Sequence, residues 1–230
     1  MKNRLILFDI DETLISSDGA GRRAIGKALA EMFDVDLSNI KVSMSGKTDP
    51  QILTEILSAG AIAESEINAR MKEILDIYIS LLQEQIDKSK SYIIHKGVPE
   101  ILDVLVKTEN AFLGLLTGNI ETGARMKLNR FDLNKFFPIG AFGSDSANRM
   151  DLPKIATDRG NNHYQIEFAP EEVTIIGDSI YDVMCAKGFG AKSLAVNTGV
   201  TRREMLVEQN PDFLFDDLSD TEKVLEAILS

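Results

Sequence analysis

The chain has 230 residues, of which 44% are hydrophobic and 27% charged, a near-average globular composition that excludes disordered, collagen-like and disulfide-scaffold proteins. Its 25 basic and 36 acidic residues give a net charge of −11, which argues against a polyanionic partner, so we expect no nucleic acid to bind. The single cysteine, Cys185, cannot form an intrachain disulfide and favours a reducing, cytoplasmic compartment. No run of about 18 apolar residues is present, so we expect no membrane-spanning segment.

The first predicted strand, Leu5–Phe8, is followed by a long interval that has the pattern of helices alone. Three helices are expected there, at Gly21–Phe33, Asp49–Leu57 and Glu64–Ile86. Apolar residues recur every three or four positions through the third, which predicts one buried face. We therefore expect a small helical domain, residues 17–89, inserted into a discontinuous α/β domain formed by residues 1–16 and 90–230.

After this block, short apolar runs alternate with amphipathic stretches, the pattern of βαβ units around a mostly parallel sheet. The further strands are expected at Ala111–Leu116, Ile139–Phe142, Val173–Ile176, Ser193–Val196 and Phe213–Phe215. The helices are expected at Val98–Lys107, Thr122–Phe131, Leu152–Arg159, Ile180–Gly188, Arg202–Glu208 and Asp220–Leu229. The fold class predicted from this order is α/β.

Carboxylates follow the first strand directly, at Asp9, Asp11 and Glu12. In open parallel sheets, ligands bind beyond the carboxyl ends of the strands, so a site is expected here. An aspartate in this place can be a nucleophile, a metal ligand or a general acid and base. The alternative is an acidic loop that caps the following segment.

Polar residues also follow two later strands. Thr117, Gly118 and Asn119 could bind a phosphate through a hydroxyl and backbone N–H groups, or could form an ordinary turn and helix cap. Asp178 and Asp182 lie four residues apart across a strand-to-helix turn. One could bind a metal while the other holds a metal-bound water or orients a neighbour.

These strand ends, in this order, resemble the motifs of the haloacid dehalogenase superfamily, particularly its phosphoglycolate phosphatase-like members. The first motif of that family, Asp-x-Asp-x-Thr, is matched by Asp9 to Thr13, and the second by Thr117. The fourth motif, Gly-Asp-x-x-x-Asp, is matched by Gly177 to Asp182. The resemblance implies a Rossmann-like parallel-sheet core with an inserted all-helical cap domain, corresponding to the helical block.

The third motif of the family is a lysine or arginine shortly before the helix that precedes the last acidic strand. Arg149 and Lys154 both qualify. Pro153 suits a first helical turn, which would place Arg149 ahead of the helix and Lys154 inside it. We therefore favour Arg149 and keep Lys154 as the alternative; either could instead be a solvated surface cation.

The resemblance implies a Mg²⁺-dependent phosphatase that acts on a small phosphorylated metabolite. Asp9 would attack phosphorus to give an aspartyl-phosphate, and Asp11 would protonate the leaving group and then deprotonate water. The metal would be held by Asp9, the backbone carbonyl of Asp11 and Asp178, with Asp182 nearby. The phosphoryl oxygens would be held by Thr117 and the backbone of Gly118 and Asn119, with Arg149 or Lys154 balancing charge.

Other functions stay open at this point. Lys47, in a polar segment before the second predicted helix, could bind a substrate carboxylate or be a surface charge. Hexose-phosphate mutases share the aspartates, and phosphonate hydrolases of the same superfamily need a cap lysine, for which Lys27, Lys47 and Lys72 are candidates. A non-catalytic binding protein is the alternative outside enzymes. The expected assembly is a monomer or a homodimer.

Overall fold

Six parallel strands form the central sheet of the computed structural model, which describes residues 2–33 and 40–230. Met1 and residues 34–39, at the start of the predicted α/β domain and inside the predicted helical block, lie outside the described residues. The strand order is β5-β4-β1-β6-β7-β8. The bounds are β1 Arg4–Phe8, β4 Ala111–Leu116, β5 Ile139–Ala141, β6 Val173–Gly177, β7 Lys192–Val196 and β8 Phe213–Phe215. All six predicted strands are present, so the α/β prediction is confirmed.

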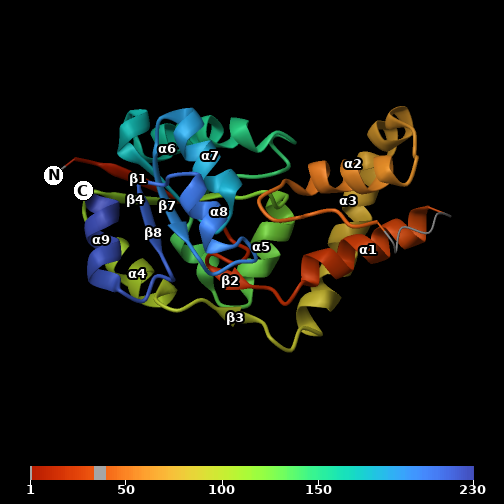
Figure 1. Cartoon of the computed structure of the whole chain (residues 1–230), viewed down its shortest axis with the longest axis horizontal. Helices are drawn as coiled ribbons and strands as arrows, with labels where there is room; N and C mark the ends of the chain where they lie inside the picture. The colour runs from red at the N-terminus through yellow and green to blue at the C-terminus, as the bar shows by residue number, and fades with distance from the viewer. Residues whose placement is uncertain (1, 34–39) are drawn as a thin grey trace.

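Helices cover both faces of this sheet. Strand β1 is fully buried, and its alternate side chains point to opposite faces, so each face needs a covering layer. Leu5 and Leu7 pack with residues of α6 and α7, whereas Ile6 and Phe8 pack with residues of α4, α5 and α9. Figure 1 shows α6 and α7 above the sheet and α4 and α9 below it. The bounds are α4 Val98–Leu105, α5 Glu121–Asn129, α6 Leu152–Tyr164, α7 Ile180–Phe189, α8 Arg203–Glu208 and α9 Thr221–Leu229.

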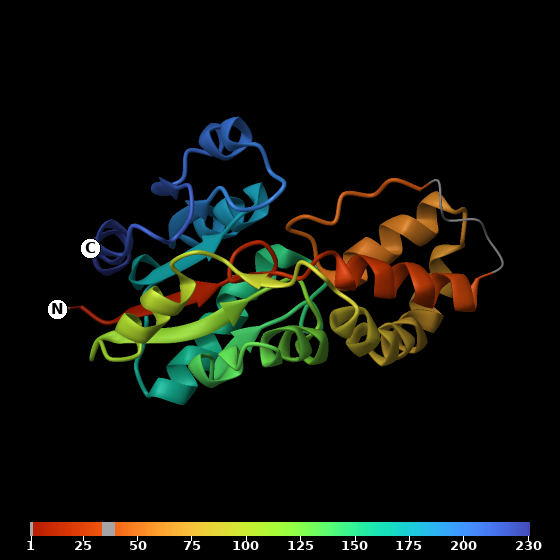
Figure 2. The same cartoon turned by 90° about the horizontal axis from the view of Figure 1, so that it is seen from below.

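Three helices form a separate unit beyond the carboxyl ends of the strands (Figures 1 and 2). Helices α1 (Ala20–Met32) and α2 (Asp49–Ala59) both pack against α3 (Glu64–Asp87). The predicted apolar face of α3 is buried at Ile67, Ile74, Tyr78, Leu82 and Ile86. We refer to α1–α3 as the helical unit.

A two-stranded antiparallel pair joins the helical unit to the sheet. Strand β2 (Ile15–Ser16) pairs with β3 (Ile93–Ile94), so the outgoing and returning chain run side by side. Sequence patterning did not predict these strands, since two residues are too few to show an alternating period. Three short 3-10 helices complete the described elements, at Leu133–Phe136, Arg149–Asp151 and Pro170–Glu172. Within residues 2–33 and 40–230, no helix combines the length and apolar character needed to span a membrane.

Candidate active site

The predicted strand-end residues lie at one edge of the sheet because three neighbouring strands end in register. Phe8 of β1 pairs with Leu115 of β4 on one side and with Ile176 of β6 on the other. The polar residues that follow these strands therefore meet in one place. They line a pocket of about 330 Å³ between the sheet and the helical unit.

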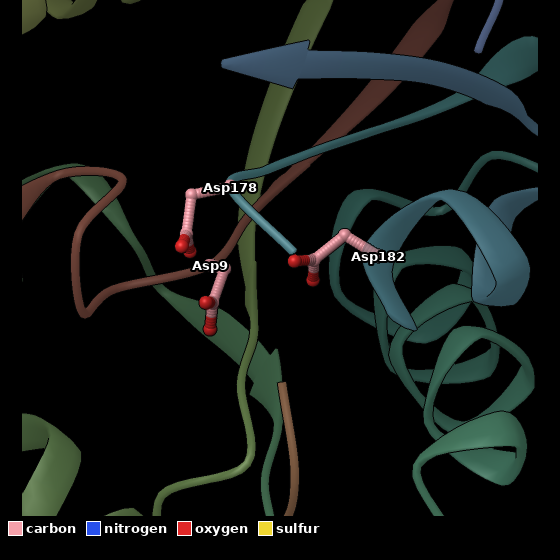
Figure 3. A group of neighbouring side chains, drawn as sticks. All are labelled: Asp9, Asp178 and Asp182. Carbon is pink, nitrogen blue, oxygen red and sulfur yellow. The ribbon is translucent and has the colours of Figure 1, made fainter. Parts of the chain in front are cut away.

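Three aspartates form an acidic cluster in or beside this pocket. Asp9 follows β1, Asp178 follows β6, and Asp182 lies in the first turn of α7 (Figure 3). All three are buried, and each offers an oxygen within 4.8 Å of the others. Burial raises the pKa of Asp9 to about 7, with Arg149 opposing the shift. Burial, then repulsion from Asp182 and Asp9, raises the pKa of Asp178 well above its usual value. Buried carboxylate oxygens this close together are the donors that a hard divalent cation prefers, so the residues fit such an ion.

Arg149 lies beside the acidic cluster, in the 3-10 turn just before α6. Its Nη2 donates to Asp182 and lies 3.4 Å from Oδ1 of Asp9. Burial works against the guanidinium charge, but the carboxylates of Asp182 and Asp9 outweigh it and raise the pKa of Arg149. Asp182 also accepts from the backbone N–H and the hydroxyl of Ser179, so its oxygens are largely engaged within the protein.

Lys154 does not reach the pocket. It lies inside α6, as the predicted helix start implies, but its side chain is 71% exposed and pairs with Asp158 one turn along the same helix. The reason is helical phase, since the buried residues of this helix include Leu152, Pro153 and Ala156. The structure therefore brings Arg149 and not Lys154 to the aspartates.

Asp11 also lines the pocket, among hydrogen-bond donors. Its Oδ2 accepts from Nζ of Lys127 at 2.6 Å and from Nδ2 of Asn119 at 2.8 Å, and its Oδ1 accepts from Ser17 at 2.9 Å. Burial alone would raise the pKa of Asp11, but Lys127 and these hydrogen bonds outweigh burial and lower it. The side chain of Asp11 is thus held by cationic and polar partners.

Thr117 and Gly118 line the same pocket. The Thr117 hydroxyl accepts from Nδ2 of Asn119 at 2.8 Å, which leaves its own proton free to donate into the pocket. Both ends of the Asn119 side-chain amide contact protein groups. Its Nδ2 donates to Thr117, and its Oδ1 accepts from Lys127 at 2.6 Å. Its side chain therefore orients its neighbours as well as lining the pocket.

A loop of the helical unit lies directly on Gly118. A Cβ atom at Gly118 would lie 2.0 Å from the carbonyl oxygen of Lys47, and the backbone N–H of Asp49 donates to the carbonyl of Gly118 at 2.7 Å. Lys47 lines the pocket, but its ammonium group pairs with Glu55 of α2. The loop closes one side of the pocket, and the charge of Lys47 is already balanced.

Asp49, at the start of α2, is a carboxylate of the helical unit that reaches the sheet side. It is buried, lines the pocket, and accepts from the backbone N–H of Ile120 at 2.9 Å. Burial raises its pKa to about 6, although Lys127 opposes the shift. Asp49 thus joins the helical unit to the residues that follow β4.

Sequence reasoning missed Lys127 and Asp49. The signal for Lys127 was present, because it shares a helical face with Ala124 and Leu128, which are both buried. A lysine on such a face is rarely buried without a charged partner. Asp49 gave no distinct signal, since an acidic residue in the first turn is ordinary at a helix start.

Comparison with known proteins agrees with this arrangement. A model of the haloacid dehalogenase-like hydrolase family matches residues 6–196. Phosphoglycolate phosphatase 1 of Pseudomonas aeruginosa is 25% identical over 222 residues, which are 94% of this chain and 78% of that protein. The fold is similar to that of a hydrolase from Pseudomonas syringae, with a TM-score of 0.70, 23% identity, and 99% of both chains covered. It is also similar to CbbY from Rhodobacter sphaeroides, solved in complex with phosphate, with a TM-score of 0.71, 18% identity, and 95% and 96% of the chains covered.

Proposed function

The chain belongs to the haloacid dehalogenase-like hydrolase family, and from this premise we propose that it is a phosphatase that hydrolyses a small phosphate monoester through an aspartyl-phosphate on Asp9. The observation that carries the proposal is that Asp9 lies beside Arg149 and Asp178 in a pocket that Thr117 and Gly118 also line. A phosphate dianion repels a carboxylate nucleophile, so a site of this kind needs positive charge and hydrogen-bond donors around the phosphoryl group.

We assign one residue or more to each step of the proposed reaction. An oxygen of Asp9 would attack phosphorus while the bond to the leaving alkoxide breaks. Asp11, whose lowered pKa keeps it ionised at rest, would take up a proton from solvent as the anionic ester binds and would pass it to the alkoxide. Asp11 would then take a proton from a water molecule as that water attacks phosphorus, which releases inorganic phosphate and restores Asp9. The hydroxyl of Thr117 and the backbone N–H of Gly118 would donate to the phosphoryl oxygens.

A divalent cation is the proposed cofactor, and Mg²⁺ suits the hard oxygen donors best. Asp9 and Asp178 would hold it, together with the backbone carbonyl of Asp11, while Asp182 stays engaged with Arg149 and Ser179. The bound ion would balance the charge of the buried carboxylates and of the phosphoryl group. Arg149 supplies further positive charge on the side of Asp9.

We propose that residues 17–89 act as a cap domain on an α/β core formed by residues 1–16 and 90–230. The loop at Lys47 lies on Gly118, and the pocket of about 330 Å³ has room for a compact ester. The name of the Pseudomonas aeruginosa relative makes phosphoglycolate the first substrate to test. A cytoplasmic location fits the lone, unbridged Cys185, and the assembly state stays a prediction.

The test is phosphate release from a panel of small monoesters and a phosphonate, with Mg²⁺ and with excess chelator. We expect metal-dependent release from at least one compact ester, and its loss in Asp9→Asn. Release at the wild-type rate by Asp9→Asn would remove Asp9 as the nucleophile. With a sugar phosphate, isomerised product and little free phosphate would indicate a mutase, and no turnover of any ester would favour a binding protein.

A further inference from the structure

Lys127 is a buried cation that the proposed reaction does not yet use. Its side chain is 5% exposed, on the face of α5 that packs under the helical unit. A buried ammonium group is costly unless its charge is paired and its protons are donated. Lys127 meets this requirement with two acceptors, each 2.6 Å from Nζ: Oδ2 of Asp11 and Oδ1 of Asn119.

These two contacts decide how the amide of Asn119 is turned. A lysine ammonium group only donates, so the oxygen of the Asn119 amide must face it and the NH₂ group must face away. That NH₂ group then donates to Oδ2 of Asp11 and to the hydroxyl of Thr117, both at 2.8 Å. Lys127 therefore orders a chain of hydrogen bonds that ends on two residues of the proposed reaction.

The donors are distributed unequally between the two oxygens of Asp11. Among residues 2–33 and 40–230, Lys127 and Asn119 both donate to Oδ2, whereas only the hydroxyl of Ser17 donates to Oδ1. A carboxylate oxygen can accept two hydrogen bonds, so Oδ1 keeps capacity for one more partner. This leaves Oδ1 as the oxygen able to exchange a proton with the leaving group.

We propose that Lys127 is a positioning residue that fixes the carboxyl group of Asp11, with Oδ1 directed to the leaving-group oxygen. The inference rests on the proposed phosphatase function. Proton transfer requires the donor and acceptor atoms to lie within hydrogen-bond distance, so a carboxyl group that turns freely would spend less time in the productive position. The competing view is that Lys127 only ties α5 to the strand ends and supports the fold.

The dependence of the rate on the leaving group separates these two views. An alkoxide leaves poorly without a proton, whereas 4-nitrophenolate leaves readily without one. The value of kcat/KM reports the steps up to departure of the leaving group and does not include the later attack by water. Misplacing Asp11 should therefore lower kcat/KM for alkyl esters far more than for 4-nitrophenyl phosphate.

The experiment compares wild type with Lys127→Met and Lys127→Arg, using the best alkyl ester of the panel and 4-nitrophenyl phosphate. In Lys127→Met we expect kcat/KM to fall about 10- to 100-fold for the alkyl ester and less than about threefold for the aryl ester. Lys127→Arg, which keeps the charge, should recover part of the loss. Lys154→Met is the matched control, because that lysine is exposed on α6, and it should behave as wild type.

Equal losses on both esters, or no loss on either, would overturn the positioning role. If Lys127→Met does not fold in a thermal unfolding assay, Lys127→Gln is used for the same comparison, since it removes the ammonium group but keeps a polar side chain in the buried site. If the wild type is active and the Lys127 variant loses kcat/KM equally on both esters, the positioning role of Lys127 is refuted and the proposed function stands. A wild type that releases no phosphate from either ester would remove the proposed function and this assignment together.

Discussion

Replacing Gly118 by alanine should push the Lys47 loop off the strand ends. The added Cβ would lie 2.0 Å from the Lys47 carbonyl oxygen and 2.7 Å from its carbonyl carbon, so the loop must retreat by about 1 Å or more to reach ordinary contact distances. Both neighbouring atoms belong to backbone, which cannot yield by turning a side chain. Forced overpacking of this kind costs about 1–3 kcal/mol.

That cost applies when the loop lies on Gly118 and disappears when it moves away. The closed arrangement should therefore lose population by roughly 5- to 150-fold relative to an open one, because 1.4 kcal/mol corresponds to a factor of ten. If substrate binds with the loop closed, KM should rise by up to that factor. Turnover at saturation should change less, because bound substrate restores closure.

The assay is steady-state phosphate release by Gly118→Ala over a wide substrate range, with Gly26→Ala as the matched control. Gly26 lies within α1 and an added Cβ there meets nothing within 4 Å. The control should keep the wild-type KM and gain up to about 1 kcal/mol in free energy of unfolding, from better helix propensity. An unchanged KM in Gly118→Ala would refute the view that the closed loop forms part of the substrate site.

Three further predictions concern charge. Arg149→Met should lower the free energy of unfolding by about 3–5 kcal/mol in chelator, because it leaves the buried carboxylates of Asp9 and Asp182 without their cation; a loss below about 1 kcal/mol in urea unfolding would contradict this. Mg²⁺ at a hundred times its dissociation constant should stabilise the protein by about 2.7 kcal/mol, which raises Tm by about 5–10 °C, and Asp178→Asn should reduce this rise. The pKa of Asp49 is raised from 3.8 to about 6, so the folded state binds more protons than the unfolded state between these values. The stability of the wild type should therefore fall by about 2 kcal/mol more than that of Asp49→Asn as pH rises from 4 to 6; parallel pH profiles would show that Asp49 ionises normally.

The strand ends could be predicted because their signals are local. A run of apolar residues that stops at Asp9 or Asp178 shows both the strand and its end, and parallel strands in one sheet bring these ends together. Pro153 favoured Arg149 over Lys154 without deciding between them, and helical phase separates them: one lies just before α6 beside the aspartates, the other on its exposed face.

The residues that sequence reasoning missed depend on contacts between distant parts of the chain. Lys127 and Asp11 are 116 positions apart, and Asp49 and Ile120 are 71 positions apart. No period or spacing in the sequence relates such positions, because their contact depends on how the helical unit sits on the sheet. The position of Lys127 on the apolar face of α5 was the one sign in the sequence that it would be buried.

The pairing of β2 with β3 has a consequence for how such a protein can change during evolution. Ser16 lies opposite Ile93, so the two ends of the inserted segment are neighbours in space. A segment with adjacent ends can be shortened, lengthened or exchanged at little cost in loop-closure entropy, while the strands that carry the aspartates keep their register. Substrate choice and chemical step can then diversify separately, one in the insertion and the other in an unchanged sheet.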